Sequence, residues 1–263
     1  MKILHIGDQA GSASITSNIC TKMGHESLVL QDKNIETFLH GEYYKNTLYM
    51  EKDDIFTALK AAISEGYDHF VYHDQIALAT AADHLHVSSS YMFHGNMLRQ
   101  NTKLYNQVMN LESIDNIFIT TEDLLEFAPE AHLFNRPVDM DMFYNMGIKE
   151  KHQIGLCLTQ ERYVPFIRDM VRGSETGVFI VDRVKNKLEY KNMPSILNQY
   201  RLYYDIKYQP THPPTLIKDI SQTALQALAC GLTVWSNGKV YTKFPEQNSD
   251  ENSAREFIRV LEE

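Results

Sequence analysis

A histidine that directly follows an apolar stretch is the clearest chemical signal in this sequence of 263 residues. His94 comes after Ser89–Phe93, and Gly95 then permits a turn. At the end of a strand such a histidine could contact a sugar hydroxyl or donate to a transferring group near neutral pH, although a histidine that only caps a loop would look the same. Arg99 and His73, which ends another apolar stretch, could contact an acceptor or a phosphate.

The loop Gly7–Ser12 (GDQAGS) is a second candidate, between the first apolar stretch and the first helical pattern. Gly11 would let the backbone approach a ligand closely, and Ser12 would open a helix whose N–H groups and positive dipole end attract an anion. The loop lacks the complete G-x-G-x-x-G pattern and the lysine of a P-loop. An ordinary strand-to-helix turn is the competing interpretation.

The segment Ile220–Trp235 (ISQTALQALACGLTVW) is a third candidate. Ser221 and Thr223 open a helical pattern, and their hydroxyls with the neighbouring N–H groups could seat a diphosphate. Gln226, one turn further on, could meet a ribose hydroxyl. A buried helix with two incidental hydroxyls would give the same pattern.

Several histidines raise the question of a metal site. His69 and His73 would share one face of a strand, and His84 and His86 lie close together in the sequence. No acidic third ligand stands at a characteristic spacing, and the sequence has no Cys-x-x-Cys pair. We therefore expect no metal.

These candidates need a framework that brings strand ends together. Short apolar stretches alternate with helical patterns, which predicts parallel sheets covered by helices on both faces. The predicted strands are Lys2–Gly7, Glu26–Gln31, His69–His73, Ser89–Phe93, Asn116–Thr120, Gln153–Leu158, Gly177–Asp182, Leu202–Ile206 and Leu232–Trp235. The predicted helices with clear patterns are Ser12–Met23, Asp53–Ser64, Glu161–Val171, Ile217–Cys230 and Ser253–Leu261.

The charge distribution places a boundary inside the chain. Up to Val138 the sequence has nine Lys and Arg against 18 Asp and Glu, whereas the remainder has 16 of each. The change coincides with Phe134–Phe143, where Pro137 interrupts regular structure. We predict two doubly wound domains, 1–138 and 139–263, with ligands at the carboxyl ends of the strands and in a cleft between the domains. One domain with a lopsided surface is the alternative.

Composition excludes several classes of protein. Hydrophobic residues make up 43% and charged residues 22%, as in ordinary globular chains. A net charge of −9 argues against a nucleic-acid binder. No apolar run is long enough to span a bilayer, and the N-terminus is too polar after Ile6 for a secretory signal. The three cysteines are far apart and odd in number, so we expect the cytoplasm.

Five passages in order along the chain carry a resemblance to a known family. They are KILHIGD…GSAS, YDHFVYHDQIALA, YMFHGNMLR, ITTEDLLEFAPEAHLFNRPVDMDMF and SQTALQALACGLTVW. Together they resemble glycosyltransferases of the GT-B type, in particular family 4, or group 1. The resemblance implies two Rossmann-like domains facing a cleft, in a compact version because this chain is short for the family. The last helix often returns to the first domain in that family.

The resemblance also implies roles for individual residues. His94 matches the active-site histidine, and Gly11, with Ser12 beside it, matches the glycine that approaches the donor phosphates. Ser221 and Thr223 match residues beside the donor diphosphate, and Gln226 stands where a ribose contact is expected. Tyr190–Pro194 matches a loop that faces the base, which brings Lys191 to the donor.

The sequence departs from the family pattern at its Glu pair and at its Arg and Lys pair. The second member of its Glu pair is Gln226, and the first would fall at Lys218, which reverses the charge. A neutral Gln loses a charge-assisted bond of about 1.5–3 kcal/mol to the ribose, which would weaken donor binding by about one to two powers of ten. The family's Arg and Lys pair has no clear counterpart, although Arg162 is the nearest arginine and we count it as donor-binding.

The leading hypothesis is a glycosyltransferase of the hexosyl type. It would move a sugar from a nucleotide diphosphate sugar to a hydroxyl of a sugar, a lipid-linked acceptor or a protein, without a cofactor, in the cytoplasm or peripherally at a membrane. The alternatives are an accessory subunit whose donor site has decayed, which the missing Glu pair favours, and a sugar-nucleotide epimerase on the same fold. The sugar, the base, the acceptor, the stereochemical course and the oligomeric state stay open.

Overall fold

Two separate sheets organise the chain. The computed structural model describes residues 1–8, 11–34, 43–159, 163–172, 177–182, 185–186, 188–209, 215–216 and 219–263. Contacts among these residues divide the chain into a first unit, Met1–Pro137 with Asp250–Glu263, and a second unit, Val138–Ser249. The last helix of the chain therefore belongs to the first unit.

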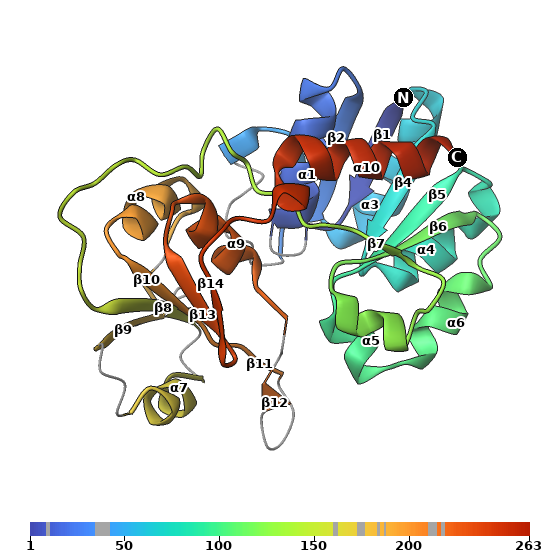
Figure 1. Ribbon diagram of the computed structural model, residues 1–263. Helices are drawn as coiled ribbons and strands as arrows, with labels where there is room; N and C mark the ends of the chain where they lie inside the picture. The colour runs from blue at the N-terminus through green and yellow to red at the C-terminus, as the bar shows by residue number, and fades with distance from the viewer. Residues whose placement is uncertain are drawn as a thin grey trace. The chain divides into compact units, whose positions relative to one another are not determined.

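The sheet of the first unit has seven parallel strands in the order β3-β2-β1-β4-β5-β6-β7 (Figure 1). Parallel strands need crossover connections, and helices supply them. The strands are β1 Lys2–Ile6, β2 Glu26–Asp32, β3 Thr47–Met50, β4 His69–His73, β5 Ser89–Phe93, β6 Ile114–Ile119 and β7 His132–Leu133. The helices are α1 Ser12–Lys22, α3 Lys52–Ser64, α4 Ile76–Ala82, α5 Asn96–Gln100, α6 Lys103–Met109 and α10 Asp250–Glu262.

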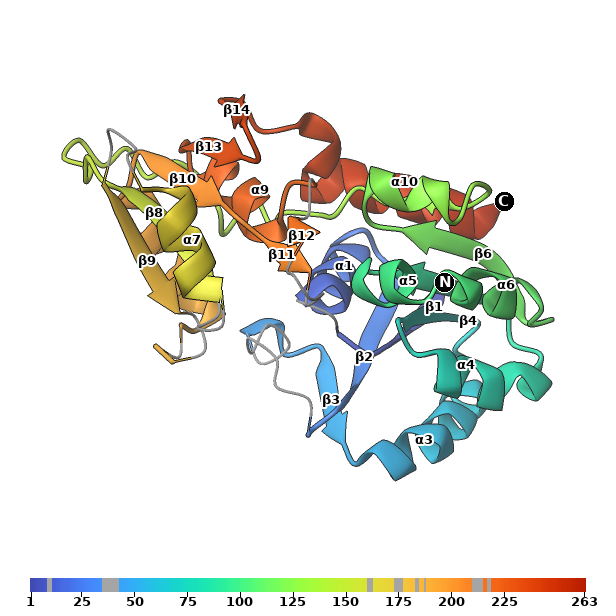
Figure 2. The same cartoon turned by 90° about the horizontal axis from the view of Figure 1, so that it is seen from below.

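Successive residues of the central strands point to opposite faces of this sheet, and each face has its own core. On one face, Leu4 and Tyr72 pack with Leu59 of α3. On the other face, Ile3 and the ring of Phe257 from α10 share a second core. Figure 2 shows α10 on one side of the strands and α3 and α4 on the other.

The C-terminal helix α10 is an integral part of the first unit. Its Phe257 ring lies within 5.3 Å of the Phe118 ring and 5.5 Å of the Phe134 ring, measured between centroids. The Ser253 hydroxyl donates a hydrogen bond to the carbonyl of Asn135. Because Phe257 is fully buried, α10 closes one face of the sheet beside α1 (Figure 1).

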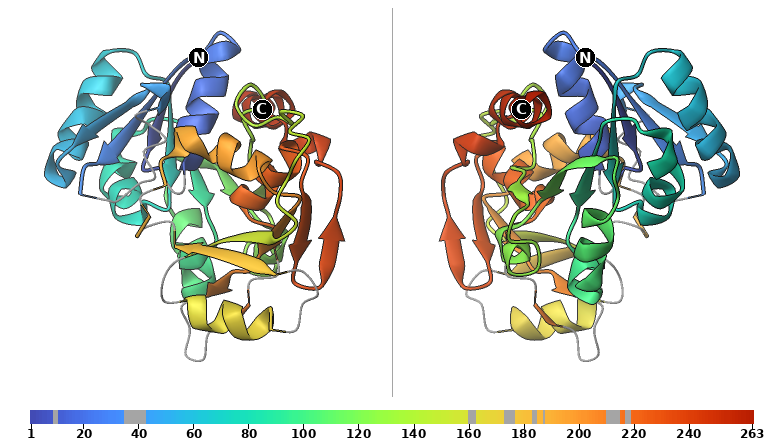
Figure 3. Two further views of the ribbon diagram at one scale, coloured as in Figure 1. Left: turned by 90° about the vertical axis from the view of Figure 1, so that its left-hand side faces the viewer. Right: turned by 90° about the vertical axis from the view of Figure 1, so that its right-hand side faces the viewer.

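The second unit has a five-stranded sheet in the order β14-β13-β10-β8-β9. Four strands are parallel, and β14 pairs antiparallel with β13 at one edge (Figure 3). Its strands are β8 Gly155–Thr159, β9 Val178–Asp182, β10 Leu202–Asp205, β13 Thr233–Ser236 and β14 Lys239–Tyr241, and its helices are α7 Val164–Met170, α8 Met193–Asn198 and α9 Gln222–Ala229. A small antiparallel pair joins β11 Tyr208–Gln209 to β12 Thr215–Leu216.

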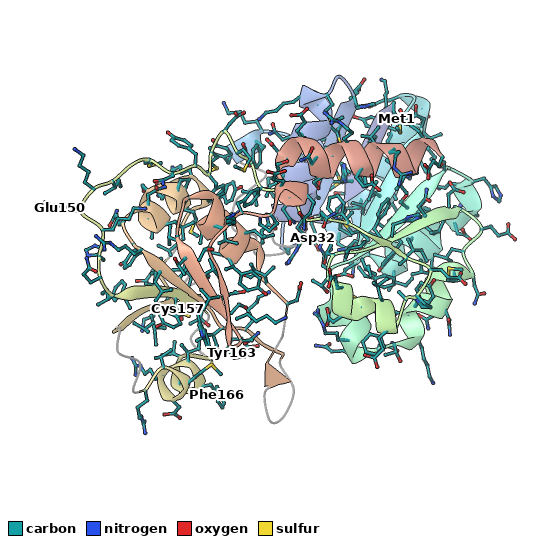
Figure 4. All side chains as sticks on the ribbon, in the orientation of Figure 1. Met1, Asp32, Glu150, Cys157, Tyr163 and Phe166 are labelled. Atoms are coloured by element: carbon teal, nitrogen blue, oxygen red, sulfur yellow. The ribbon has the colours of Figure 1, made fainter. Side chains whose placement is uncertain are left out.

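One core of the second unit lies between the sheet and α7. Cys157 of β8 packs with Ile167 and Tyr204, and Tyr163 lies against the same cluster (Figure 4). Phe166, on α7 as well, is 42% exposed and does not belong to this core. This core is therefore built on β8, the first strand of the second unit.

The predicted two-sheet fold is confirmed, with differences at the ends of elements. The helix predicted over Ile217–Cys230 begins at Gln222, because Ser221 is extended and serves as its N-cap. The helix predicted over Glu161–Val171 is α7, which begins at Val164 with Pro165 in its first turn, as proline favours. Strands β3, β7 and β14 were not predicted.

Candidate functional site

Polar residues gather at the carboxyl edge of the first unit's sheet. Strands β1, β4, β5 and β6 are consecutive neighbours, and all run in the same direction. Their ends therefore bring together residues from four distant parts of the sequence: Asp8, Asp74, His94 and Thr121. This is the edge at which parallel α/β sheets bind ligands.

His94 ends a row of three hydrogen-bonded imidazoles. Its Nε2 lies 2.9 Å from Nδ1 of His73, and the two rings stack with centroids 5.2 Å apart. Nε2 of His73 lies 3.0 Å from Nδ1 of His5. His94 is half-buried, whereas His73 and His5 are completely buried. Because Nε2 of His94 faces His73, Nδ1 is the atom with which His94 can contact a substrate.

All three rings are held neutral. Burial, together with the positive charge of Arg136, lowers the pKa of His94 to about 3. Burial and then His69 lower the pKa of His5 to about 3. Burial and the two flanking histidines hold the pKa of His73 well below its usual value. The row therefore works as a hydrogen-bonded chain of neutral imidazoles near pH 7.

His73 does not have the position that we expected. It was predicted to contact an acceptor or a phosphate, yet its side chain is covered completely and both ring nitrogens face other histidines. Its place in the row is to hold His94. Nothing in one sequence could indicate this, because His5 and His73 are 68 residues apart.

Asp74 and Arg136 adjoin His94 and were not singled out from the sequence. Both carboxylate oxygens of Asp74 lie 3.3 Å from the backbone nitrogen of His94, which donates to them. The residue has φ 54°, a left-handed conformation that Asp tolerates better than most residues. Burial raises the pKa of Asp74 to about 7, although the bond from His94 opposes this. The charge of Arg136 acts directly on His94.

Arg99 is committed to a partner within the protein. Its Nε and one terminal nitrogen bond the two carboxylate oxygens of Asp123 at 2.7 and 2.8 Å, and the same terminal nitrogen donates to Thr121 Oγ1 at 2.9 Å. The side chain is only 7% exposed. A Cβ on Gly95, where φ is +102°, would meet the guanidinium. Arg99 therefore fixes the turn after His94, and the predicted contact with acceptor or phosphate is not supported.

The glycine loop of the first unit holds a negative charge of its own. Gly11 is the N-cap of α1 with φ 79°, and one carboxylate oxygen of Asp8 accepts from the backbone nitrogens of Ala13 and Ser14 at 3.0 and 3.2 Å. The other oxygen of Asp8 accepts from the Ser14 hydroxyl at 2.5 Å. Burial raises the pKa of Asp8, and these three bonds lower it. The anion that this helix end attracts is Asp8, which is unfavourable for the predicted phosphate contact at Gly11 and Ser12.

Ser12 itself is nearly covered. Its residue is 8% exposed, and its hydroxyl oxygen has no hydrogen-bond partner among the residues that the structure describes. It sits in the first position of α1, one residue after Gly11. The loop therefore brings Ser12 to the same helix end as Asp8, facing inward.

The helix end in the second unit is arranged differently. The Ser221 hydroxyl accepts from the backbone nitrogen of Ala224 at 2.9 Å, which is a standard N-cap. The Ser221 nitrogen donates to Asp205 Oδ2 at 2.8 Å, and the Ser236 hydroxyl bonds the same oxygen at 3.2 Å. The carboxylate thus lies behind the cap residue, at the ends of β10 and β13. Asp205 was not predicted.

The other predicted donor contacts do not form one cluster: two lie on α9, one lies before α8, and the rest fall outside the described residues. Thr223 and Gln226 lie on α9 and are 8% and 3% exposed, so the helix buries both for the most part. Lys191 lies on the short helical turn before α8 and bonds Glu189 at 2.8 Å. Arg162 and Lys218 fall outside the residues that the structure describes.

Metal and membrane features can be checked over the described ranges. Within them, no group of three or more His, Cys, Asp or Glu side chains could hold a metal ion. His69 bonds the hydroxyls of Ser88 and Ser90, each at 2.9 Å. In the same ranges no helix is both long and apolar enough to cross a bilayer.

Comparison with solved structures identifies the fold. No protein-family model matches the chain, and no curated protein sequence matches it. AviGT4, a glycosyltransferase involved in avilamycin A biosynthesis, matches 100% of this chain and 97% of its own, with a TM-score of 0.65 at 9% identity. An α-glucosyltransferase solved with UDP and a 13-mer DNA matches 99% and 88%, with a TM-score of 0.56 at 13% identity.

The chain has the GT-B fold. The two sheets, with seven and five strands, correspond to glycosyltransferase structures over essentially the whole chain. At such low identity the similarity shows only the fold of this chain. What the chain does chemically must be argued from its own residues.

Proposed function

We propose that this GT-B protein is a glycosyltransferase that moves a hexosyl group from a nucleotide diphosphate sugar to a hydroxyl acceptor. The observation that carries the proposal is the placement of His94. A neutral imidazole stands at the carboxyl edge of the first unit's sheet, with one nitrogen held by His73 and the other available to a substrate. The similarity of five passages to glycosyltransferase family 4 supports the same reading.

The donor is assigned to the second unit. When the sugar leaves, negative charge develops on the diphosphate, and helix N-termini stabilise such charge. In α9 the cap is a neutral serine, whereas in α1 the first-turn N–H groups already bond a carboxylate. Ser221 and Thr223 would lie beside the diphosphate and Gln226 beside the ribose, with Lys191 and Arg162 as further donor contacts.

The acceptor is assigned to the first unit, with His94 at the reacting sugar. His94 would orient a sugar hydroxyl through Nδ1, and His73 would hold the ring in place. The bond from the anomeric carbon to the diphosphate oxygen breaks, a bond to the acceptor oxygen forms, and the nucleoside diphosphate and the acceptor proton are released. No cofactor or metal takes part in this proposal.

The charge of the first unit argues against a nucleic-acid acceptor. The first 138 residues carry 18 acidic against nine basic side chains, so we propose a sugar, a lipid-linked acceptor or a protein hydroxyl rather than a nucleic acid. DNA in the solved complex of the α-glucosyltransferase is a feature of that protein. All three cysteines are buried and unpaired, which supports a reducing, cytoplasmic setting.

Two observations favour a second function. Gln226 replaces the family's glutamate, and the glycine loop of α1 is occupied by Asp8. An accessory subunit that has lost donor binding would tolerate both features. This alternative predicts a stable protein without affinity for any nucleotide sugar.

Calorimetry with UDP-glucose, UDP-N-acetylglucosamine, GDP-mannose and dTDP-glucose separates the two functions. A transferase binds at least one of them, and mass spectrometry then shows the sugar on a hydroxyl acceptor. A folded protein that binds none of the four is contradictory to the proposal and favours the accessory subunit. An isomerised sugar nucleotide formed without acceptor would indicate an epimerase.

A further inference from the structure

The three histidines form a diagonal across three neighbouring strands. In the parallel register, His5 on β1 pairs with Val71 on β4, and His73 on β4 pairs with Met92 on β5. His73 is two residues beyond Val71, and His94 is two beyond Met92, so all three side chains belong to one face of the sheet. The row therefore runs from the carboxyl edge of the sheet into its interior.

The number of protons in this row is fixed. A neutral imidazole has one N–H and one lone pair, and each contact between two rings needs one of each. Three neutral rings have three protons, and the two contacts use two of them. The third proton must lie at one end, either on Nδ1 of His94 or on Nε2 of His5.

The interior end is unfavourable for that proton. Nε2 of His5 is buried and has no hydrogen-bond partner among the described residues. The His5 ring stacks on Phe257 of α10, with centroids 6.1 Å apart, so an aromatic ring covers it. Among the described residues Nε2 of His5 lacks a partner in both tautomers, but a buried N–H without an acceptor is rarer in folded proteins than a buried acceptor without a donor, so the tautomer with a bare Nε2 on His5 is favoured.

We propose that His5 and His73 are positioning residues that lock His94 in the tautomer with its proton on Nδ1. In this tautomer, Nδ1–H of His5 donates to Nε2 of His73, and Nδ1–H of His73 donates to Nε2 of His94. Each ring thereby sets the proton of the next. We call this arrangement the tautomer lock. Its role in catalysis rests on the proposed function, but the tautomer of His94 itself does not depend on that function.

The lock specifies what His94 does in the proposed reaction. Its Nδ1 is a hydrogen-bond donor to a sugar oxygen, and its only lone pair, on Nε2, is taken by His73. His94 therefore does not accept the acceptor's proton. Inward transfer along the row is blocked as well, because a proton that reached Nε2 of His5 would have no acceptor there.

Tautomers can be read directly from long-range ¹⁵N–¹H correlation spectra of the full chain labelled with ¹⁵N-histidine, with His94→Gln used for assignment. We expect His94 to show protonated Nδ1 and bare Nε2 in most molecules. A proton on Nε2, or an even mixture of the two tautomers in the wild-type protein, overturns the proposal.

Glutamine substitutions test the dependence on the interior end. An amide can donate or accept, so His5→Gln removes the bias, and the share of the Nδ1–H form of His94 should fall to about half. His73→Gln should do the same and serves if His5→Gln does not fold. His69→Gln is the control for a change beside His5 that leaves the row's contacts in place, because His69 bonds the hydroxyls of Ser88 and Ser90 and not a ring of the row, and it should leave His94 unchanged.

The outcomes separate this proposal from the proposed function. The spectra need no substrate, so a protein without transferase activity can still show the lock. If transfer occurs, kcat of His5→Gln should fall about twofold, in step with the tautomer share, at an unchanged KM for the donor. An unchanged His94 spectrum in both glutamine variants shows that neither residue sets the tautomer and overturns the proposal.

Discussion

Each unit has a helix that starts near the carboxyl ends of its parallel strands, and each places a buried aspartate there. In the first unit, Asp8 bonds the first-turn N–H groups of α1 directly. In the second, Asp205 bonds the residue before α9, and the serine hydroxyl of Ser221 caps the helix. The two helix ends differ in which backbone N–H groups the carboxylate bonds: two of the first turn in α1, and that of the cap residue before the helix in α9. The comparison teaches that a glycine loop before a helix is not in itself an anion site.

The largest expected effect tests whether the first unit acts on the reacting sugar while the second unit binds the donor. His94→Ala should lower kcat by about 100-fold to 1000-fold, the loss typical of removing one preorganised hydrogen-bond donor from a reacting centre. The donor affinity measured by calorimetry should stay within about twofold, because the donor is assigned to the second unit. Normal turnover in this variant would remove His94 from the reaction.

A substitution on α9 comes next in size. Gln226→Glu introduces a carboxylate at the proposed ribose contact and should tighten nucleotide-sugar binding by about tenfold to a hundredfold, through a charge-assisted bond to the ribose. Gln199→Glu, at the exposed C-cap residue of α8, is the control for added charge alone. Equal affinity in wild type and Gln226→Glu would show that this side chain does not meet the donor.

A pair of variants tests whether the two helix ends differ in donor binding. Ser221→Ala should weaken donor binding by about tenfold and Asp8→Ala by less than twofold. Asp8→Ala should instead lower the free energy of unfolding by about 1–3 kcal/mol, because two buried first-turn N–H groups lose their acceptor. Donor binding that responds more strongly to Asp8 than to Ser221 would reverse the assignment.

The last effect concerns pH. Burial raises the pKa of Asp74 to about 7, so the folded protein keeps a proton there that the unfolded chain loses above about pH 4. This contribution to stability is present at low pH and is lost as pH rises towards 7, at up to about 1.4 kcal/mol per pH unit. The three histidines of the row, and buried His69, act in the opposite sense, since their lowered pKa values make folding less favourable below about pH 6.5.

Asp74→Asn isolates its part of this balance. Urea unfolding at pH 5 and pH 7 should show a larger gain in stability with rising pH for Asp74→Asn than for wild type, because the opposing contribution of Asp74 is removed. Identical differences between the two pH values in both proteins would mean that Asp74 is ionised throughout this range.

The sequence was sufficient for the fold where periodicity is strong. The buried strand Lys2–Ile6 and the amphipathic helix Lys52–Ser64 were found within one residue of their ends. The edge strand Thr47–Met50 was missed because it is half exposed and has no clear alternation. Strand Lys239–Tyr241 was missed although Asn237-Gly238, with φ 48° and 82°, is the strongest short signal for a hairpin turn.

The site was less predictable for a physical reason. His94 could be found because one strand places it, but its partners His73 and His5 meet it through the register of three parallel strands, which a single sequence does not specify. Arg99 and Asp123 follow the neighbouring strands β5 and β6, so their ion pair depends on the register of those two strands and could not be expected from the sequence. Asp8 stands three residues before the N-cap Gly11, a spacing that hides its role as a cap.

The most direct test of the account is hydrogen exchange of the full chain with and without a saturating nucleotide sugar that calorimetry has shown to bind. The account predicts slower exchange of the backbone amides from Ser221 to Gln226 at the start of α9. The amides of Ala13 and Ser14 should be unaffected. Slower exchange at Ala13 and Ser14, with none at the start of α9, would contradict it.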